Sequence, residues 1–260
     1  MPGFARPLWQ ALRAWWRIVH LGAVIVVLAL SPSSWQPPWR GAIARQVWLG
    51  SAPVLLGFAL ISTVLSVVIM RIVLVTAQSY GLSQYALEMV VRVLVLELIP
   101  LTAALFVALR VSLPLAVELA ELRGTDALAA LREDGVDVLR EEIVPRAVGS
   151  LFAVLMLAAI SSVICLVLAY LLVHGFSPWG LERYTRLVGR VFEPAVTLIF
   201  VMKTLAMAAA VSLIPIGTAL HDSRHPRLGT ARAVFELQAL VRMFFAILLI
   251  ELASLVGNYY

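Results

Sequence analysis

The sequence predicts an all-α polytopic membrane protein, with an N-terminal interfacial amphipathic helix, five transmembrane helices and a short cytoplasmic helix between the second and third. Residues 46–70 and 147–173 carry no charge, while 93–109 and 194–220 carry one charged residue each, Glu97 and Lys203. A helix needs about 20 apolar residues to cross the hydrocarbon core. Hydrophobic residues make up 62% of the 260-residue chain and charged residues 13%, more apolar surface than a soluble core of this size requires.

An N-terminal helix over 4–20 is expected to lie in the headgroup layer. Its apolar side chains share one broad face and arginines are interspersed, which is typical of interfacial helices. The residues concerned are Leu8, Leu12, Trp15, Trp16 and Val19, with Arg6, Arg13 and Arg17. Residues 21–30 are too short to cross alone, but 15–30 together could form an additional span, and this alternative stays open. The prolines of 31–39 break the helix, so we divide the chain into a helix and linker, 1–40, and a five-span domain, 41–260.

The five spans are expected near residues 48–75, 89–113, 147–173, 194–217 and 233–256. Pro194 suits the start of the fourth span, because a proline in the first turn of a helix loses no hydrogen bond. With the N-terminus in the cytoplasm, thirteen arginines fall in cytoplasmic segments and four on the opposite side. The positive-inside rule favours this orientation, which leaves the C-terminus on the far side. The net charge of +5 therefore needs no nucleic-acid partner.

The only long charged segment, 117–146, falls between the second and third spans. Thr125 or Asp126 can cap a short helix over 127–133, and Gly135 can end it. This helix mixes apolar and charged residues, namely Leu128, Leu131, Arg132, Glu133 and the following Asp134. The segment is either a docking surface for another protein or an ordinary solvated loop.

Motifs of a self-contained enzyme are missing from the sequence. There is no GxxxxGK[ST] loop around Lys203, the only lysine, and no HExxH, CxxC or GxSxG. His221 and His225 are four residues apart, but Pro226 follows directly, so a basic loop explains them better than a metal site. The lone Cys165 excludes an internal disulfide. We expect no catalytic residue, metal or cofactor, and any transport must draw on an ion gradient or a partner's ATP.

Two ionisable residues, Glu97 and Lys203, lie inside predicted spans. A charge in hydrocarbon costs at least ~2.5 kcal/mol, so such groups usually face protein or a wet cavity. Pro100 follows Glu97 by three residues and predicts a kink beside it. Three interpretations remain: Glu97 and Lys203 pair with each other, each has a separate structural partner, or either meets an anionic lipid headgroup.

The chain around these residues resembles the MlaE-type (YrbE-type) permease family, membrane subunits of ABC transporters that move lipids with MCE-domain partners. The family's R-E-L-G-P-like and A-A-x-x-x-A-x-R motifs are matched by Glu97, Leu98, Pro100, Ala103, Ala104 and Arg110. Further matches are Glu118, Leu122, Asp126, Leu128, Gly135, Val136, Asp137, Pro145 and Arg146. The resemblance covers about 45–256 and is specific over 96–146. Leu96 and Ile99 replace the family's arginine and glycine, which implies different packing around the second span.

The resemblance implies the roles of particular residues. A lipid cavity would be lined by Tyr80, Glu97 and Lys203, and the basic residues at the cytoplasmic ends of the first and fifth spans would be Arg45 and Arg232. The loop 124–138 would take up motion from an ATPase, through Thr125, Asp126, Leu128, Leu131, Arg132, Glu133 and Asp137.

The function so implied is that of a permease subunit in the bacterial inner membrane. It would work as a dimer, with a second copy or a paralogue, and would exchange membrane lipid with an MCE-domain lipid-binding protein. ATP would be hydrolysed by a separate ABC ATPase subunit. Two alternatives remain: a membrane scaffold that transports nothing, and an ion-coupled carrier that relies on Glu97 and Lys203.

Overall fold

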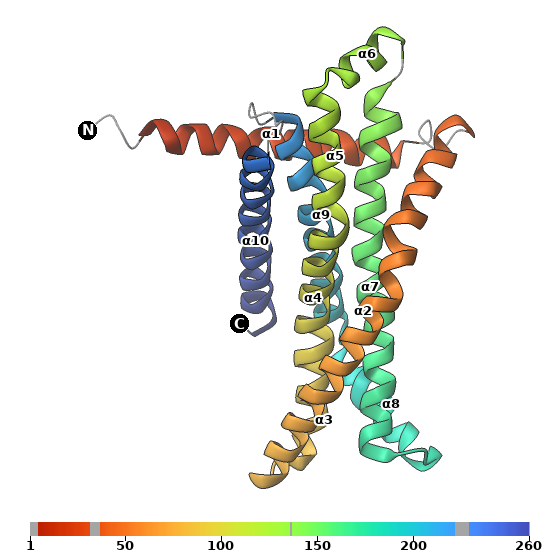
Figure 1. Cartoon of the computed structure of the whole chain (residues 1–260). Coiled ribbons are helices and arrows are strands. Elements are labelled where there is room, and N and C mark those ends of the chain that lie inside the picture. The colour runs from red at the N-terminus through yellow and green to blue at the C-terminus, as the bar shows by residue number, and fades with distance from the viewer. Residues whose placement is uncertain (1–4, 32–36, 136, 222–228, 260) are drawn as a thin grey trace.

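The computed structural model describes residues 5–31, 37–135, 137–221 and 229–259, and every regular element in these ranges is a helix (Figure 1). Five stretches within them are long and apolar enough to cross a membrane: Arg40–Ser79, Tyr85–Gly124, Leu139–His174, Pro194–Leu220 and Val234–Asn258. The predicted all-α, five-span fold class is confirmed.

The elements follow one another without a strand in the described ranges. In chain order they are α1 (Ala5–Leu30), α2 (Pro37–Ser79), α3 (Ser83–Val90), η2 (Val91–Leu98), α4 (Ile99–Val107), η3 (Ala108–Ser112), α5 (Leu113–Gly124), α6 (Ala127–Glu133), η4 (Leu139–Ile143), α7 (Val144–His174), η5 (Pro178–Gly180), α8 (Leu181–Val191), α9 (Pro194–His221) and α10 (Gly229–Tyr259). Figure 1 shows α6 at one end of the bundle and α8 at the other, and we name these the α6 end and the α8 end.

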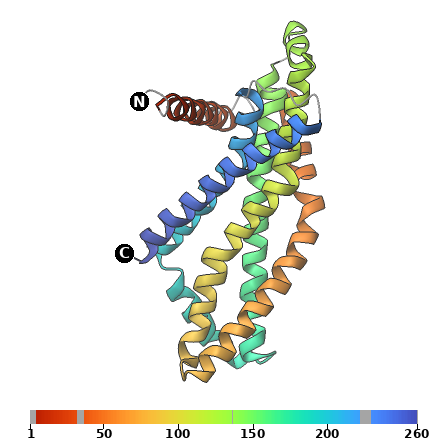
Figure 2. The same cartoon turned by 60° about the vertical axis from the view of Figure 1, so that its left-hand side comes forward.

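The N-terminal helix α1 lies crosswise near the α6 end instead of running along the bundle (Figures 1 and 2). It packs against α9, where a Cβ on Gly217 would come within 2.9 Å of Ile18. Ile18 and Ile25 are buried, whereas Trp16 and Val19 of the predicted apolar face point away from the protein. A crosswise helix with an exposed apolar edge has the arrangement of a helix in the plane of the membrane interface.

Three π-helical segments widen the second and third spans, and each ends two residues before a proline. The pairs are η2 before Pro100, η3 before Pro114 and η4 before Pro145. A proline within a helix has no N–H and clashes with the carbonyl four residues earlier. A wider π turn relieves this conflict and keeps the backbone hydrogen-bonded inside a membrane. The kink expected at Pro100 is therefore taken up by a wider turn in a helix that continues, and the same holds at Pro114 and Pro145.

The long helices α2 and α7 have the most extensive pairing in the bundle. Two glycines allow the close approach near the α6 end, since a Cβ on Gly149 would lie only 2.9 Å from the carbonyl oxygen of Gln46. A Cβ on Gly50 would lie 3.5 Å from the carbonyl oxygen of Gly149, at the same contact. The contact fixes the first turns of α2 against the start of α7.

The main core lies where α4, α7, α9 and α10 meet, with Val107, Leu157, Met207 and Ile247 fully buried. Figure 2 shows α10 inclined to the other long helices, and both views place the C-terminus well short of the α2–α3 turn. The α8 end of the bundle is therefore built by α2, α3, α7 and α8 without α10.

Candidate functional site

Charged side chains from three spans meet inside the bundle. The ammonium of Lys203, on α9, forms ion pairs with Glu97, on η2, and with Glu251, on α10; its Nζ lies 2.8 Å from Oε2 of Glu251. Nζ also donates hydrogen bonds to Glu97 and to the backbone carbonyl of Leu96, the latter at 3.3 Å. Asn258 Nδ2 donates to Oε1 of Glu97 at 3.3 Å. We name Glu97, Lys203, Glu251 and Asn258 the ion cluster.

The ion cluster is deeply buried. The side chain of Lys203 is 1% exposed, and those of Glu97 and Glu251 are 12% and 14% exposed. Removing a charge from water costs several kcal/mol, which only well-placed opposite charges and hydrogen bonds offset. The structure thus brings Glu97 and Lys203 into direct contact, the first of the three interpretations drawn from the sequence. That these residues line a lipid cavity stays a prediction.

Glu251 belongs to this site although the sequence analysis gave it no role. Its signal was an acid in the otherwise uncharged stretch 243–260 at the end of the fifth span, which by the cost of membrane-buried charge indicates an internal partner. The signal was weak because the same span also holds Glu236 and Arg242, so no single acid stood out.

The charge balance of the ion cluster limits what it can bind. With all three groups ionised, two carboxylates share one ammonium and the cluster carries one net negative charge. An anionic group can reach Lys203 only by displacing a carboxylate. A hydrogen-bond donor or a cation, by contrast, meets carboxylate oxygens that accept directly. The cluster therefore acts as an internal latch among three spans, and any anion that binds there must open it.

Tyr80 lies at the turn between α2 and α3, and it is 76% exposed. Between this turn and Glu97 stand α3 and most of η2, a helical distance of about 20 Å. The structure therefore does not bring Tyr80 into contact with the ion cluster. Its role at the mouth of a lipid cavity stays a prediction.

The short helix α6 occurs where the sequence predicts it, but its cap differs. Asp126 adopts a positive φ of 58° and forms no side-chain cap, so the predicted capping bond is wrong. The Thr125 hydroxyl donates back to carbonyls of α5 instead. Asp137 caps the following helix, where its Oδ1 accepts from the Leu139 N–H at 3.2 Å. Gly135, with a φ of 80°, ends α6 as expected.

The two faces of α6 have different surroundings. Leu128 is buried in a cluster with residues of α1, α5, α7 and α9, and Leu131 packs at the edge of this cluster. Arg132 and Glu133 are exposed at the tip of the bundle. Leu128 therefore anchors α6 to the bundle, whereas a partner protein would meet the charged side chains. Contact between α6 and an ATPase stays a prediction.

Two polar contacts tie α9 to its neighbours at the α6 end. Arg123, at the end of α5, donates from Nη1 to the carbonyl oxygen of Ala219 at 3.2 Å. Arg242, on α10, donates to the Thr218 hydroxyl at 3.3 Å. Because α9 also carries Lys203, this one helix connects the base of α6 with the ion cluster.

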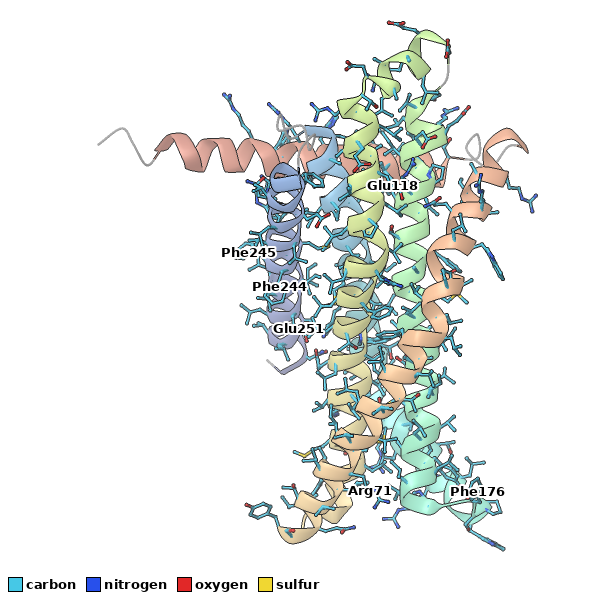
Figure 3. All side chains as sticks on the ribbon, viewed as in Figure 1. Arg71, Glu118, Phe176, Phe244, Phe245 and Glu251 are labelled. Carbon is cyan, nitrogen blue, oxygen red and sulfur yellow. The ribbon has the colours of Figure 1, made fainter. Side chains whose placement is uncertain are left out.

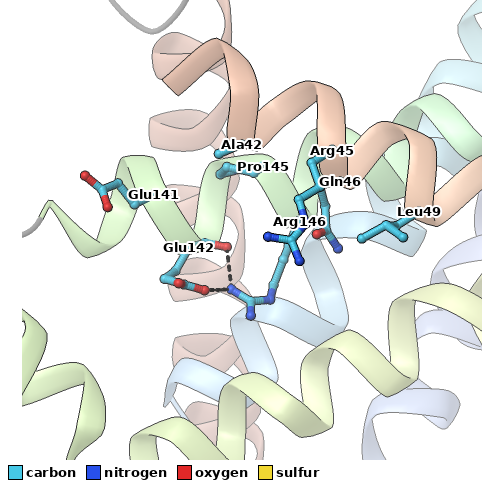
Figure 4. A pocket seen from close by; sticks show the side chains of 8 residues that line it. All are labelled: Ala42, Arg45, Gln46, Leu49, Glu141, Glu142, Pro145 and Arg146. Atoms are coloured by element: carbon cyan, nitrogen blue, oxygen red, sulfur yellow. Dashed lines mark hydrogen bonds and ion pairs between the residues drawn. The ribbon is translucent and has the colours of Figure 1, made fainter. Parts of the chain in front are cut away.

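Of the two predicted basic residues, Arg45 lies on α2 and lines a pocket at the α6 end, together with Glu141, Glu142 and Arg146 (Figure 4). The side chain of Arg232 lies outside the residues described. The same holds for His221 and His225, and the described residues contain no cluster of metal-binding side chains.

The sequence analysis placed no element between the third and fourth spans, but most of 174–192 is the helix α8. The Tyr184 hydroxyl donates to the carbonyl oxygen of Leu166 at 2.7 Å, and burial raises the pKa of this phenol to about 12. Phe176 and Trp179 are almost fully exposed (Figure 3 labels Phe176). The missed signal was the helical spacing of Tyr184, Leu187, Val188 and Val191 among charged residues.

Comparison with known proteins identifies the family of the chain. No curated protein matches the chain. The family described as Permease MlaE matches residues 43–256, which include all five candidate spans except the first residues of the first and the last residues of the fifth. This match and the five-span helical fold indicate a membrane permease component of lipid transport. The chain belongs to the MlaE permease family.

Proposed function

We propose that the chain is the permease subunit of an ABC transporter that moves phospholipid or another lipid between the inner membrane and an MCE-type partner. ATP hydrolysis takes place on a separate subunit. Membership of the permease family supports the transport role. The observation that carries the mechanism is the position of α9, which holds Lys203 in the ion cluster and contacts the base of α6 through Ala219.

In this mechanism the ATPase moves α6, and the motion passes through α5 and the Arg123–Ala219 contact to α9. A small displacement of α9 separates Lys203 from Glu97 and Glu251, because the ammonium contacts both carboxylates at short range. While the helices are apart, the charged groups lie in a low-dielectric interior without their present partners. A polar headgroup can then pair with them. Return of α9 re-forms the ion pairs and expels the headgroup.

The assembly and orientation follow from the same proposal. The α6 end faces the cytoplasm, consistent with the excess of arginines assigned to that side. A second copy or a paralogue completes the transport pathway. The α8 end faces the MCE-type partner, and the exposed Phe176 and Trp179 are part of that surface.

The test is reconstitution of the chain with its ATPase and MCE-type partners in liposomes that contain a fluorescent phospholipid. We expect ATP-dependent transfer of the lipid to or from the MCE-type protein, and its loss in an ATPase variant unable to hydrolyse ATP. Copurification of the ATPase without any transfer would identify a scaffold. Transfer that follows an imposed ion gradient and ignores ATP would identify an ion-coupled carrier.

A further inference from the structure

The structure contains a second charged site, at the α6 end between the first turns of α2 and the start of α7. It is a pocket of about 430 Å³ (Figure 4), within the size range of small-ligand sites. Its charged lining consists of two arginines and two glutamates, Arg45, Arg146, Glu141 and Glu142. We name this the headgroup pocket.

The two arginines of the headgroup pocket lack enough acceptors. Figure 4 shows the guanidinium groups of Arg45 and Arg146 facing the same space from two different helices. Arg146 is 14% exposed and pairs with Glu142 through Nη1. Its Nε is buried and has no acceptor among the described residues, and no described acid pairs with Arg45. Two neighbouring guanidinium groups with free donors form a site for an anion with several oxygens, such as a phosphate.

The carboxylates extend the charge pattern. Glu142 lies beside Arg146, and Glu141 lies at the outer edge of the pocket on the same turn of η4 (Figure 4). A ligand with one anionic and one cationic group therefore finds a partner for each. This arrangement disfavours a purely anionic ligand, because like charges repel it from the glutamates.

A second groove continues from the headgroup pocket along α2. It has a volume of about 390 Å³ and shares Gln46 and Leu49 with the pocket. Its lining is mostly apolar or small, including Pro53, Val54 and Val111, and also contains Arg110 and Glu118. A polar site that opens into an apolar groove has the shape needed for an amphiphile.

The position of the pocket along the bundle also indicates a lipid ligand. Trp48 lies on α2 between the lining residues Gln46 and Leu49 and is 70% exposed, and exposed tryptophans of membrane proteins gather at the headgroup layer. The crosswise α1 lies near the same end of the bundle. The close contact of Gly149 with Gln46 keeps α2 and α7 at a fixed separation beside the pocket.

We infer that the headgroup pocket binds a zwitterionic phospholipid with a primary ammonium group, taken from the leaflet at the α6 end. The phosphate lies on Arg45 and Arg146, the ammonium on Glu141 and Glu142, and an acyl chain follows the groove along α2. The inference rests on the proposed lipid-transport function and adds to it a binding site for lipid in the leaflet opposite the α8 end. This site is separate from the ion cluster.

The inference is tested by crosslinking in nanodiscs that contain the full chain. The probe is phosphatidylethanolamine with a photoactivatable acyl chain, and phosphatidylglycerol with the same chain is its anionic counterpart. We expect phosphatidylethanolamine to label peptides that contain 46–54 and 110–118. Arg45→Ala should reduce this labelling about tenfold, because it removes a charge-assisted hydrogen bond. Arg40→Ala is the matched control, since Arg40 is an exposed arginine of the same helix outside the pocket.

Two further variants protect the test against misfolding. Arg146→Lys keeps the positive charge but loses the planar donor set, and it should reduce labelling less than Arg45→Ala. Glu141→Gln together with Glu142→Gln should shift the preference towards phosphatidylglycerol. Equal loss in Arg40→Ala and Arg45→Ala would overturn the inference, as would labelling that ignores the headgroup.

In a last measurement, the ATPase partner is added to the nanodiscs before crosslinking. If the ATPase abolishes labelling in the wild-type chain, the surface belongs to a protein interface and the inference is wrong. The crosslink is read without ATP and without transport. A chain that transports no lipid can therefore still show a bound headgroup, and an active transporter can still fail this test.

Discussion

The ion cluster and the headgroup pocket contain the same kinds of group but differ in how their charges are satisfied. Each combines one or two cations with two glutamates. In the ion cluster the cation has two acidic partners and is almost completely buried. In the headgroup pocket Arg45 is exposed, and the Nε of Arg146 has no acceptor among the described residues. A buried cation held between two acids gives a latch between helices, whereas arginines with free donors at an open surface give a site for a ligand.

Among the variants that test this comparison, removal of Lys203 is expected to have the largest effect on stability. Lys203→Met leaves two carboxylates in the interior without a cation, which should lower the free energy of unfolding by about 3–5 kcal/mol. The measurement is the midpoint of thermal unfolding in detergent. Lys203→Arg, which keeps the charge, should lose clearly less. Equal stability of Lys203→Met and the wild type would show that the ion cluster is no latch.

Substitution of the two acids of the ion cluster should lower stability by different amounts. Glu97 is paired with Lys203 and also accepts a hydrogen bond from Asn258, so Glu97→Gln should cost about 2–3 kcal/mol of stability. Either variant leaves one carboxylate opposite the ammonium, but the Asn258 bond is made to Glu97, so Glu251→Gln should cost less, below about 1 kcal/mol. Denaturant titration of the two variants, made with the same side-chain change, decides the order. A larger loss for Glu251→Gln would contradict the arrangement.

The exposed charges of α6 test where the ATPase binds. The double variant Arg132→Glu and Glu133→Arg reverses both charges and keeps the net charge. It should weaken copurification of the ATPase about tenfold, or ~1.4 kcal/mol, with unfolding unchanged. Leu128 is unsuitable for this test because it is buried. If the double variant binds the ATPase like the wild type and Arg45→Glu does not, the ATPase contacts the headgroup pocket instead.

The smallest effect is expected at Tyr184, a buried polar group with one neutral partner. Tyr184→Phe removes the hydrogen bond to the Leu166 carbonyl and should cost about 1 kcal/mol. Burial raises the pKa of this phenol to about 12, above the ~10 of an unfolded chain. Its contribution is therefore complete below about pH 10 and is lost as pH rises towards 12.

Ultraviolet titration of the tyrosines measures this pKa directly. Tyr184→Phe should remove the last phenol to ionise, and Tyr85→Phe, at an exposed tyrosine of α3, should leave it in place. Ionisation of all tyrosines near pH 10 in the wild type would contradict the burial of Tyr184.

The spans could be predicted because the cost of charge in hydrocarbon leaves long uncharged stretches in the sequence. The helix α6 was predictable for a different reason, since Gly135 marks its end. The π turns before Pro100, Pro114 and Pro145 were not, because a proline alone does not reveal whether a helix kinks, stops or widens. The capping of Asp126 failed because its backbone adopts the left-handed conformation, which only the tertiary arrangement determines.

The candidate site was predictable only in part. Glu97 and Lys203 stood out as isolated charges, and each needed a partner. The choice of Glu251 depends on how α10 inclines towards α9, which no local pattern encodes. The headgroup pocket could not be found from sequence at all, because its residues come from segments about 100 positions apart and are ordinary basic and acidic residues near helix ends.

The length of α2 has a consequence for where lipid is exchanged with a partner. Its 43 residues extend for about 64 Å, roughly twice the thickness of a hydrocarbon core. Arg71 follows Trp48 by 23 residues, or about 35 Å of helix, close to the thickness of a hydrocarbon core. Figure 3 places Arg71 towards the α8 end, and Tyr80 lies about 13 Å of helix beyond it. In the orientation proposed above, the α2–α3 turn and α8 project beyond the membrane on the side away from α6. We propose that a partner docked on this projection exchanges lipid with the permease without touching the bilayer.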